Sequence, residues 1–363
     1  MRASFIAFLF AAFATLGPQP APAGDDLRSG VNRVNLAWRT AAEQQEILGE
    51  IAASGVTDIR LSLSRPVDRS IDALKIADAL GLNILLEIQL SNKSYYPPGL
   101  KPRTGHDRVW DIHRLSDLDL EKYRTELSSA LTRIDEAGIR LEAVEPGNEI
   151  NISPYNGDLH VYPVRGVRTA RSIDELRNRS AFEKGLDKYV DSLRITRDLL
   201  DATVHSREAK LVSSGLSDMR AQTADRLGLE RLDAGEVIDL LQERGLDEIV
   251  DAYGIHIYPG NRTASAIERR IGELLEFCLP AETGHPCWIT EWGVANTSQE
   301  CPVDDGKREV VVRNVLQTFD DLSDTGRLEA VFYYDWDSHD RYSVWRCGGL
   351  SPAGALAVGL EEK

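Results

Sequence analysis

Several classes of functional motif are missing from this sequence of 363 residues. It has no G-x-G-x-x-G turn for a dinucleotide and no P-loop for a nucleoside phosphate. No C-x-x-C or C-x-x-H spacing suits zinc, and the first predicted strand lacks the H-x-H pair of a metal-dependent hydrolase. These absences predict a protein without a metal ion or a cofactor.

Basic residues are scarce relative to acidic ones. The chain has 42 Lys and Arg against 58 Asp and Glu, which gives a net charge of -16 at pH 7. Binding to nucleic acid or to an anionic membrane requires a positive surface potential. We therefore expect neither as a partner, apart from an export signal, and we expect a monomer with a neutral or locally selected ligand.

Only the N-terminus carries a long apolar run. Residues 1–16 have one positive charge followed by an apolar stretch that is short for a bilayer, and Ala21-Pro22-Ala23 fits the small-residue cleavage rule. We predict a signal peptide over residues 1–23 and a secreted or periplasmic protein; a retained membrane anchor is the alternative. No Gly-, Ser- or Pro-rich linker divides residues 24–363, which should form one domain.

Strand-like and helix-like runs alternate along this domain, which is typical of a parallel sheet with crossover helices. Strands are predicted over residues 31–38, 57–62, 83–89, 141–145, 210–214, 250–257, 287–291 and 330–336. Helices are predicted over residues 41–53, 71–80, 120–137, 182–200, 234–242, 264–277 and 307–321. The pattern predicts an α/β fold, a single (β/α)8 barrel of the triosephosphate isomerase type. Its connections after strands three and four, residues 91–118 and 151–180, are unusually long.

Four cysteines in an exported chain suggest two disulfides, for which the sequence alone allows three pairings. Cys278 ends a predicted helix and Cys287 opens the next strand, so both would lie at the bottom of the barrel. Cys301 and Cys347 follow successive strands and would lie at the top. Because a disulfide cannot span the height of a barrel, we predict Cys278–Cys287 and Cys301–Cys347.

Two glutamates stand at the ends of short apolar runs, Glu149 after predicted strand four and Glu291 at the end of strand seven. These strands face each other across the mouth of a barrel, where catalytic residues of this fold lie. Glycoside hydrolysis needs one carboxyl group to protonate the leaving oxygen and another to attack or stabilise the anomeric carbon. A separation of about 5–5.5 Å would permit a covalent intermediate and retention, whereas a larger one would mean inversion.

These positions resemble the clan A retaining glycoside hydrolases, which have an Asn-Glu pair at the end of strand four and a nucleophilic Glu at the end of strand seven. The resemblance implies that Glu149 is the acid/base, that Glu291 is the nucleophile and that Asn148 holds the sugar 2-hydroxyl. It extends over the whole mature chain at the level of the fold, but its motifs are short.

Four further residues, on three other strands, match the clan. Arg60 ends strand two, and His256 and Tyr258 belong to the Tyr-Gly-Ile-His-Ile-Tyr run of strand six. We expect His256 to contact the sugar. The resemblance implies that Arg60 and Tyr258 support the nucleophile. Trp336, at the end of strand eight, would form the floor of the sugar subsite.

The individual family is not fixed by these motifs. Residues 147–151 are similar to the strand-four motif of endo-β-1,4-galactanases, whereas residues 290–293 look more like cellulase-type or xylosidase-type relatives. Ile150 replaces the Pro that often follows Asn-Glu in cellulase-type members. The substrate therefore cannot be transferred from one family.

Other candidates for sugar contact lie near strand ends and in the two long connections. Near strand ends these are Asn35, Trp38, Gln89 and Trp292. Aromatic side chains of the connections could stack on sugars or simply anchor the loops: Tyr95, Tyr96, Trp110, Tyr155, His160 and Tyr162. Supporting carboxylates are Glu87, near the end of strand three, and Glu145, which could pair with Arg60. The cluster Arg165, Arg168 and Arg171 would favour an acidic substrate, unless it is an ordinary solvated surface.

The sequence thus predicts an exported retaining β-glycoside hydrolase that cleaves a β-linked poly- or oligosaccharide through a covalent intermediate. The long connections favour an extended cleft and endo action, although they can equally close a pocket. Two alternatives remain open. The first is a barrel that binds polysaccharide without catalysis or assists polymer export, and the second is a transglycosidase that uses the same two carboxylates.

Overall fold

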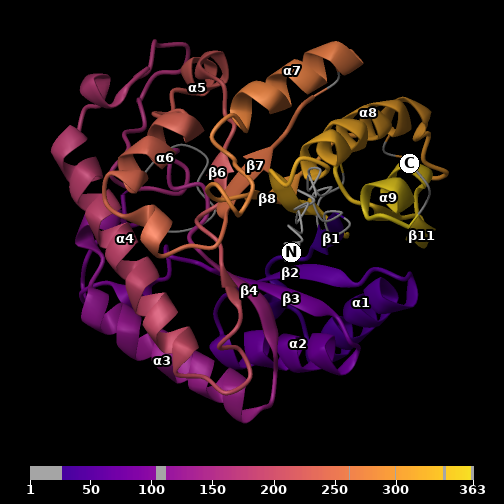
Figure 1. Cartoon of the computed structure of the whole chain (residues 1–363), viewed down its shortest axis with the longest axis horizontal. Helices are drawn as coiled ribbons and strands as arrows, with labels where there is room; N and C mark the ends of the chain where they lie inside the picture. Colours follow the sequence, from indigo (N-terminus) through magenta and orange to yellow (C-terminus); the bar gives the residue numbers. More distant parts are fainter. Residues whose placement is uncertain (1–26, 104–111, 261, 299, 338–340, 361–363) are drawn as a thin grey trace, which may run out of the picture.

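A curled, parallel sheet forms the centre of the molecule, with the helices arranged around its outside (Figure 1). The computed structural model describes residues 27–103, 112–260, 262–298, 300–337 and 341–360. The strand order is β5-β4-β3-β2-β1-β9-β8-β7-β6. The strands are β1 (Arg28–Asn32), β2 (Asp58–Leu63), β3 (Asn83–Ile88), β4 (Leu141–Pro146), β5 (Lys210–Leu211), β6 (Leu216–Ser217), β7 (Tyr253–Ile257), β8 (Cys287–Trp292) and β9 (Leu328–Tyr333).

The predicted α/β class and parallel sheet are confirmed, but the sheet has nine strands rather than eight. The predicted strand 210–214 is divided, so that β5 pairs with β4 and β6 pairs with β7. Side chains replace backbone partners at the break: Gly254 N donates to Ser213 Oγ (3.0 Å), and Ser214 N donates to the Tyr189 hydroxyl (2.6 Å). Single bridges, Val212 with Ala252 and Asn148 with Gly215, connect the residues between β5 and β6 to neighbouring strands.

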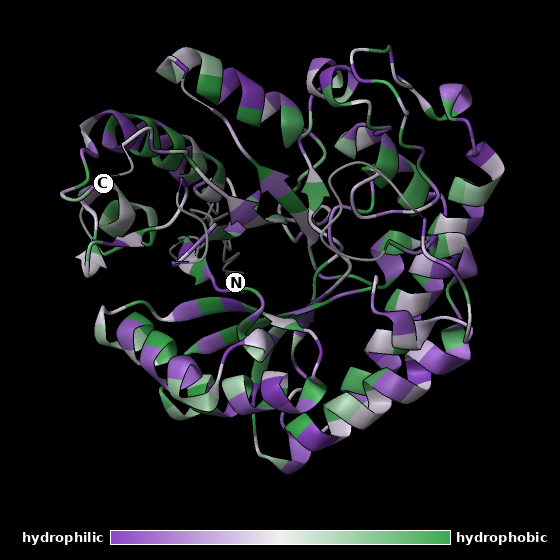
Figure 2. Ribbon diagram, turned by 180° about the vertical axis from the view of Figure 1, so that it is seen from behind, coloured by the Kyte–Doolittle hydropathy of each residue, from purple (hydrophilic) through white to green (hydrophobic). Residues whose placement is uncertain are grey.

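The helices cover the convex side of the sheet. Hydrophobic and hydrophilic residues alternate along each helix (Figure 2). All seven predicted helices are present, two of them, α1 and α6, with the predicted bounds. The helices are α1 (Ala41–Ala53), α2 (Val67–Ala79), α3 (Leu120–Glu136), α4 (Arg179–Asp201), α5 (Ala221–Leu227), α6 (Ala234–Gln242), α7 (Ala264–Leu274), α8 (Gly306–Ser323) and α9 (Pro352–Ala357). A short antiparallel pair, β10 (Trp345–Arg346) and β11 (Gly349–Leu350), precedes α9.

Local signals explain where the first helix begins. Thr40 caps α1 by accepting from Glu43 N, while the Glu43 carboxylate accepts from Thr40 N (2.7 Å). This reciprocal capping box satisfies backbone donors that the first helical turn leaves without partners. The helix then buries Ile47, Leu48 and Ile51, at three- and four-residue spacing, against the sheet.

Apolar residues fill both sides of the sheet. Every residue of β2 and of β8 is buried, as expected for strands covered on both faces. A small cluster includes Leu85 on β3 and Trp288 on β8. Since these strands are not neighbours in the sheet, such residues meet across its concave side. The polar residues at the carboxyl ends of the strands therefore surround a common mouth.

Two strands at the site end at other residues than predicted. The first, predicted over residues 31–38, stops at Asn32, because Asn35 adopts a left-handed conformation (φ 60°) and a 3-10 helix, η1 (Leu36–Trp38), follows. The last strand stops at Tyr333 and not at residue 336. The two long connections are confirmed, since their described residues, 89–103 and 112–119 after β3 and 147–178 after β4, form no further α-helix or named strand.

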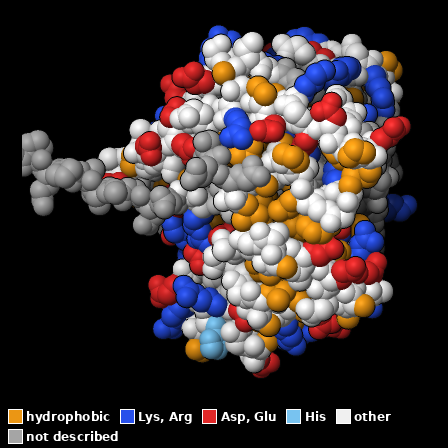
Figure 3. Space-filling model, turned by 90° about the vertical axis from the view of Figure 1, so that its right-hand side faces the viewer, with side chains coloured by type: hydrophobic (Ala, Val, Ile, Leu, Met, Phe, Trp, Pro, Cys, Tyr) orange, Lys and Arg blue, Asp and Glu red, His pale blue; other side chains and the backbone are white. Residues whose placement is uncertain are grey.

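Both predicted disulfides, Cys278–Cys287 and Cys301–Cys347, are present. Within the described ranges, no helix is long and apolar enough to cross a membrane. The predicted signal peptide, residues 1–23, lies outside those ranges. On the side where α8 and α9 lie, acidic and basic side chains are interspersed and apolar ones gather near the middle (Figure 3).

Candidate active site

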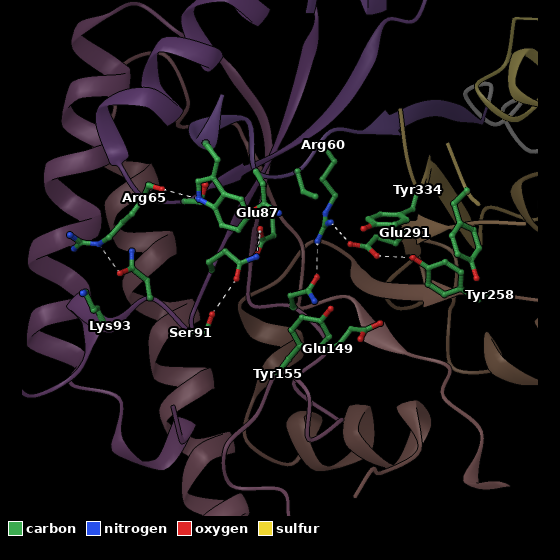
Figure 4. A pocket seen from close by; sticks show the side chains of 18 residues that line it. Arg60, Arg65, Glu87, Ser91, Lys93, Glu149, Tyr155, Tyr258, Glu291 and Tyr334 are labelled. Atoms are coloured by element: carbon green, nitrogen blue, oxygen red, sulfur yellow. Dashed lines mark hydrogen bonds and ion pairs between the residues drawn. The ribbon is translucent and has the colours of Figure 1, made fainter. Parts of the chain in front are cut away.

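A cleft of about 580 Å³ opens at the carboxyl ends of the strands. Ten residues singled out from the sequence line it: Asn35, Trp38, Arg60, Glu87, Gln89, Asn148, Glu149, Tyr155, Tyr258 and Glu291. Figure 4 shows Glu149, Tyr258 and Glu291 on one side of the cleft and Arg65 and Lys93 at the opposite side. The cleft thus brings together residues from strands that are distant in the sequence.

Glu291, the second-last residue of β8, is the most heavily bonded of the cleft carboxylates. Its Oε1 accepts from Arg60 Nη1 (2.7 Å), and its Oε2 accepts from the Tyr258 hydroxyl (3.0 Å). His256 Nδ1 lies 3.6 Å from the same Oε2. Burial would raise the pKa of Glu291, but the charges of His256 and Arg60 and the Tyr258 hydrogen bond outweigh it and hold that pKa below its ordinary value. Glu291 is therefore ionised at neutral pH, as a nucleophile must be.

Glu149 follows β4 in a left-handed backbone conformation (φ 45°), and its N–H donates to Gly215 O (2.9 Å). This turn directs the side chain toward His256, whose Nδ1 lies 3.1 Å from Glu149 Oε1. Because the same nitrogen is 3.6 Å from Glu291 Oε2, these two carboxylate oxygens cannot be farther apart than the sum of the two distances, about 6.7 Å. This upper limit admits the spacing of about 5–5.5 Å found in retaining enzymes and reaches only the lower edge of the range of about 6.5–9.5 Å found in inverting ones.

His256 was expected to contact the sugar, but it is fully buried and lies behind the cleft, next to both carboxylates. Burial lowers its pKa, yet the carboxylates of Glu291 and Glu149 raise it further, so that the net pKa is above the ordinary value. Gly215 makes room for the ring, since a Cβ at that position would lie 2.0 Å from His256 Nε2. His256 therefore contacts the two carboxylates and does not line the cleft.

Arg60, at the middle of β2, connects the two halves of the site. Besides Glu291, it donates from Nε to Glu145 Oε2 (2.6 Å) and from Nη1 and Nη2 to Asn32 (3.0 Å) and Asn148 (3.3 Å). The expected pairing of Glu145 with Arg60 is confirmed. The guanidinium thereby fixes the orientation of the Asn148 amide as well as that of the Glu291 carboxylate.

Two predicted tryptophans do not line the cleft. Trp292 is fully buried against Phe319 and Tyr333, because side chains alternate along a strand and Glu291 points to the concave side. Trp336 is also fully buried and stacks on Trp345, with ring centroids 5.1 Å apart.

Tyr334 takes the position that was predicted for Trp336. It lines the cleft directly after β9, where Ala330 and Phe332 already face the concave side. The period-two alternation of this strand, 330, 332, 334, was the signal in the sequence that could have identified it. The prediction failed because it extended the strand three residues too far.

Among the aromatic residues of the long connections that the structure describes, only Tyr155 lines the cleft. Tyr95 and Tyr96 are buried and pack on Tyr123 and His113, so they anchor their loop. Two others, His160 and Tyr162, pack on each other (4.9 Å between centroids) and do not line the cleft. Trp110 lies outside the described residues.

In the arginine cluster of the second connection, Arg168 and Arg171 form ion pairs with acidic residues on the surface. Arg168 contacts Glu175 (2.9 Å), and Arg171 forms an ion pair with Asp225. Two cleft cations, Arg65 and Lys93, were not singled out from the sequence. Exposed Arg and Lys are common on any protein surface, so nothing in their local sequence distinguishes them.

Glu87, at the end of β3, is a third carboxyl group in the cleft. Burial raises its pKa to about 7, although the positive charge of Arg60 acts in the opposite direction. The described residues contain no group of three or more His, Cys, Asp or Glu side chains that could hold a metal ion. Three carboxyl groups, those of Glu87, Glu149 and Glu291, thus line the cleft.

No protein-family model matches the sequence, and no curated protein matches it. Its structural neighbours are glycoside hydrolases. A family 39 glycoside hydrolase from the gut symbiont Bacteroides cellulosilyticus WH2 superposes with a TM-score of 0.51 at 17% identity, over 91% of this chain and 63% of that one. This chain therefore spans less than two thirds of that enzyme.

A fungal β-1,4-galactanase superposes with a TM-score of 0.53 at 15% identity, over 91% of this chain and 93% of the other. An exo-β-1,4-mannosidase from Opitutaceae bacterium strain TAV5 gives 0.56 at 13% identity, over 92% of this chain and 58% of the other. These similarities establish a shared fold. They extend over several families and indicate no single one.

Proposed function

We propose that this protein is an exported, retaining β-glycoside hydrolase in which Glu291 is the nucleophile and Glu149 the acid/base. The sheet would then be a (β/α)8 barrel whose fifth strand is divided into β5 and β6. The observation that carries the proposal is that two carboxylates approach the same nitrogen, Nδ1, of one buried imidazole, so that their oxygens lie within about 6.7 Å of each other. The fold shared with glycoside hydrolases agrees with it.

In the first step, a Glu291 carboxylate oxygen attacks the anomeric carbon as the glycosidic C–O bond breaks. Glu149 gives its proton to the departing oxygen, and the sugar remains as an ester on Glu291. In the second step, Glu149 takes a proton from water, and the resulting hydroxide displaces Glu291 from the anomeric carbon. Both carboxyl groups then return to their starting states.

The neighbours of each carboxylate suit these roles. Arg60 and Tyr258 donate to Glu291 and keep it ionised before the attack. His256 contacts Glu149 and can compensate the negative charge that remains after its proton has been given away. Asn148, held by Arg60, is available to a sugar hydroxyl in the cleft.

Export and an extended substrate are also part of the proposal. The apolar N-terminus and the two disulfides suit an oxidising, extracytoplasmic location. The cleft extends from Tyr258 to Lys93 at the surface, which favours endo cleavage of a β-linked polysaccharide by a monomer.

The direct test is release of reducing ends from a panel of β-linked glucan, galactan, mannan, xylan and glucuronan. Wild type should cleave at least one polymer, and Glu291→Gln should reduce that rate by on the order of 10⁴-fold or more, because the amide cannot form the ester. Glu208→Gln, at an exposed position far along the chain from the cleft residues, is the matched control and should retain full activity. Near-normal turnover by Glu291→Gln would contradict the proposal.

A further inference from the structure

Positive charge is distributed unequally between the two ends of the cleft. At the reaction end, Arg60 is buried and forms ion pairs with Glu145 (2.6 Å) and Glu291 (2.7 Å). At the other end, Arg65 and Lys93 line the cleft and are both exposed (Figure 4). The protein has a net charge of -16, so two exposed cations in one cleft differ in charge from the protein as a whole.

Arg65 is held in place but keeps binding capacity. Its Nε donates to Asn92 Oδ1 (2.8 Å), whereas its Nη2 lies 3.4 Å from Glu126 Oε2 in a pair whose side chains are 46% and 47% exposed. An ion pair this exposed contributes little free energy, because water screens both charges. Among the described residues, Nη1 of Arg65 has no hydrogen-bond partner, so the guanidinium can bind a further anion.

Lys93 stands next to Asn92, at the start of the short helix η2 (Lys93–Tyr95). The Asn92 side chain fixes this turn by accepting from Ser94 N (3.1 Å). The Lys93 ammonium makes no hydrogen bond or ion pair with any residue that the structure describes. One asparagine thus places both cations, one by a side-chain bond and one by chain connectivity.

Trp38 gives this end of the cleft an apolar face. It is the one exposed tryptophan among those described, at 67%, and its Nε1 donates to Arg65 O (3.1 Å). An indole ring fixed in this way is a rigid surface on which a sugar ring can stack. Stacking surface and cations therefore lie side by side, as recognition of a charged sugar requires.

Nearby acidic groups do not cancel this arrangement. Besides Glu126, the adjoining surface hollow contains Asp68, which is paired with Arg133 (2.6 Å). Deeper in the cleft, the ionised carboxylate of Glu291 would repel an anion at the reaction end. A negatively charged substituent is therefore favoured only at the Arg65 end.

We propose that Arg65, Lys93 and Trp38 form a subsite for an acidic sugar, a hexuronic acid residue within the β-linked polysaccharide, away from the bond that is cleaved. The carboxylate would accept from Arg65 and Lys93 while the ring stacks on Trp38. This inference rests on the proposed glycosidase function and adds the charge class of its substrate.

The test is calorimetric titration of the Glu291→Gln protein with oligomers that differ only in the carboxylate. The probes are two pairs of β-1,4-linked tetramers, cellotetraose with tetraglucuronate and mannotetraose with tetramannuronate. Each is titrated into the parent, into a variant that also has Arg65→Gln and Lys93→Gln, and into a control with Lys75→Gln and Arg207→Gln, two exposed residues that do not line the cleft. Both variants lose two positive charges, so their difference isolates the position of the charge.

An acidic tetramer should bind the parent more tightly than its neutral counterpart. The cleft variant should lose about 10- to 100-fold in affinity for it, as expected for losing hydrogen bonds to a charged group, while the control loses less than about 3-fold. Added salt should weaken the acidic tetramer selectively. The far-UV circular dichroism and thermal midpoint of both variants should match the parent.

Tighter binding of the neutral tetramers, or equal losses in the two variants, would overturn the acidic subsite and leave the glycosidase function intact. Absence of binding by every tetramer, together with absence of cleavage on the polysaccharide panel, would overturn both proposals. Binding of an acidic tetramer that the Trp38→Ala variant does not weaken would overturn the stacking part.

Discussion

The two ends of the cleft use the same residue type in opposite ways. Arg60 is buried and donates four hydrogen bonds, one to each of four side chains, so its geometry is fixed before any ligand arrives. Arg65 is exposed, and one good hydrogen bond holds it. The reaction end is therefore preorganised, whereas the Arg65 end has donors left for a ligand. Changes at the first should affect kcat, and changes at the second should affect KM.

The largest contrast should come from the leaving group when Glu149 is replaced by Ala. Hydrolysis of a substrate with a poor leaving group should fall by about 10²–10⁴-fold, because such an oxygen needs protonation as it departs. A dinitrophenyl glycoside of the same sugar needs little protonation and should lose far less. Rates for the two substrates, measured in wild type and variant, check this; equal losses would argue against an acid role for Glu149.

The same conservative replacement at the two arginines addresses the comparison directly. Arg60→Lys cannot keep Glu145, Asn148 and Glu291 in register, and it should reduce kcat by about 10²-fold or more. Arg65→Lys keeps a positive charge at an exposed position and should change kcat by less than about 3-fold. Any effect of this replacement should be on KM. Steady-state kinetics of both variants on one substrate measure kcat and KM. A similar loss of kcat in both would contradict the distinction between the two ends.

The smallest effect concerns stability and comes from Glu87. Its pKa in the folded protein, about 7, is above the ordinary 4.5, so its favourable contribution is complete below pH 4.5 and is lost as the pH rises through 7. That difference corresponds to roughly 3 kcal/mol of the free energy of unfolding. Glu87→Gln should therefore lose less stability than wild type between pH 4.5 and pH 8.

Urea unfolding of both proteins at the two pH values measures this change. Other titrating groups contribute equally to wild type and variant, so the difference between them isolates Glu87. A difference that does not vary with pH would show that this carboxyl group titrates normally and that the cleft does not shield it from water.

Sequence reasoning located the reaction end of the cleft better than its other end. Glu149 and Glu291 were predictable because polar residues at the ends of parallel strands must meet at one edge of the sheet. Arg60 was predicted at the end of its strand but lies in the middle of β2, from where it still reaches the site. Trp336 was misplaced because side-chain direction depends on the residue at which a strand ends, and β9 ends at Tyr333. A shift of a few residues changed which aromatic ring reached the cleft.

The remaining features depend on contacts that leave no local trace in the sequence. The division of the fifth strand depends on Ser213 and Ser214 exchanging backbone for side-chain hydrogen bonds. The position of Lys93 depends on a turn fixed by Asn92. From the sequence alone, His256 resembles an ordinary core histidine. Only its distances to Glu149 and Glu291 associate it with the site.

The central claim, that Glu291 forms a covalent bond to the sugar, is tested most directly by mass spectrometry of the intact protein after incubation with 2-fluoro β-glycosides. These compounds slow the second step, so the glycosyl ester should accumulate. We predict a mass increase of one fluorosugar on wild type, mapped to Glu291 in a peptide digest and absent from Glu291→Gln. An adduct on another residue, or no adduct from a sugar whose glycosides the enzyme cleaves, would contradict the mechanism.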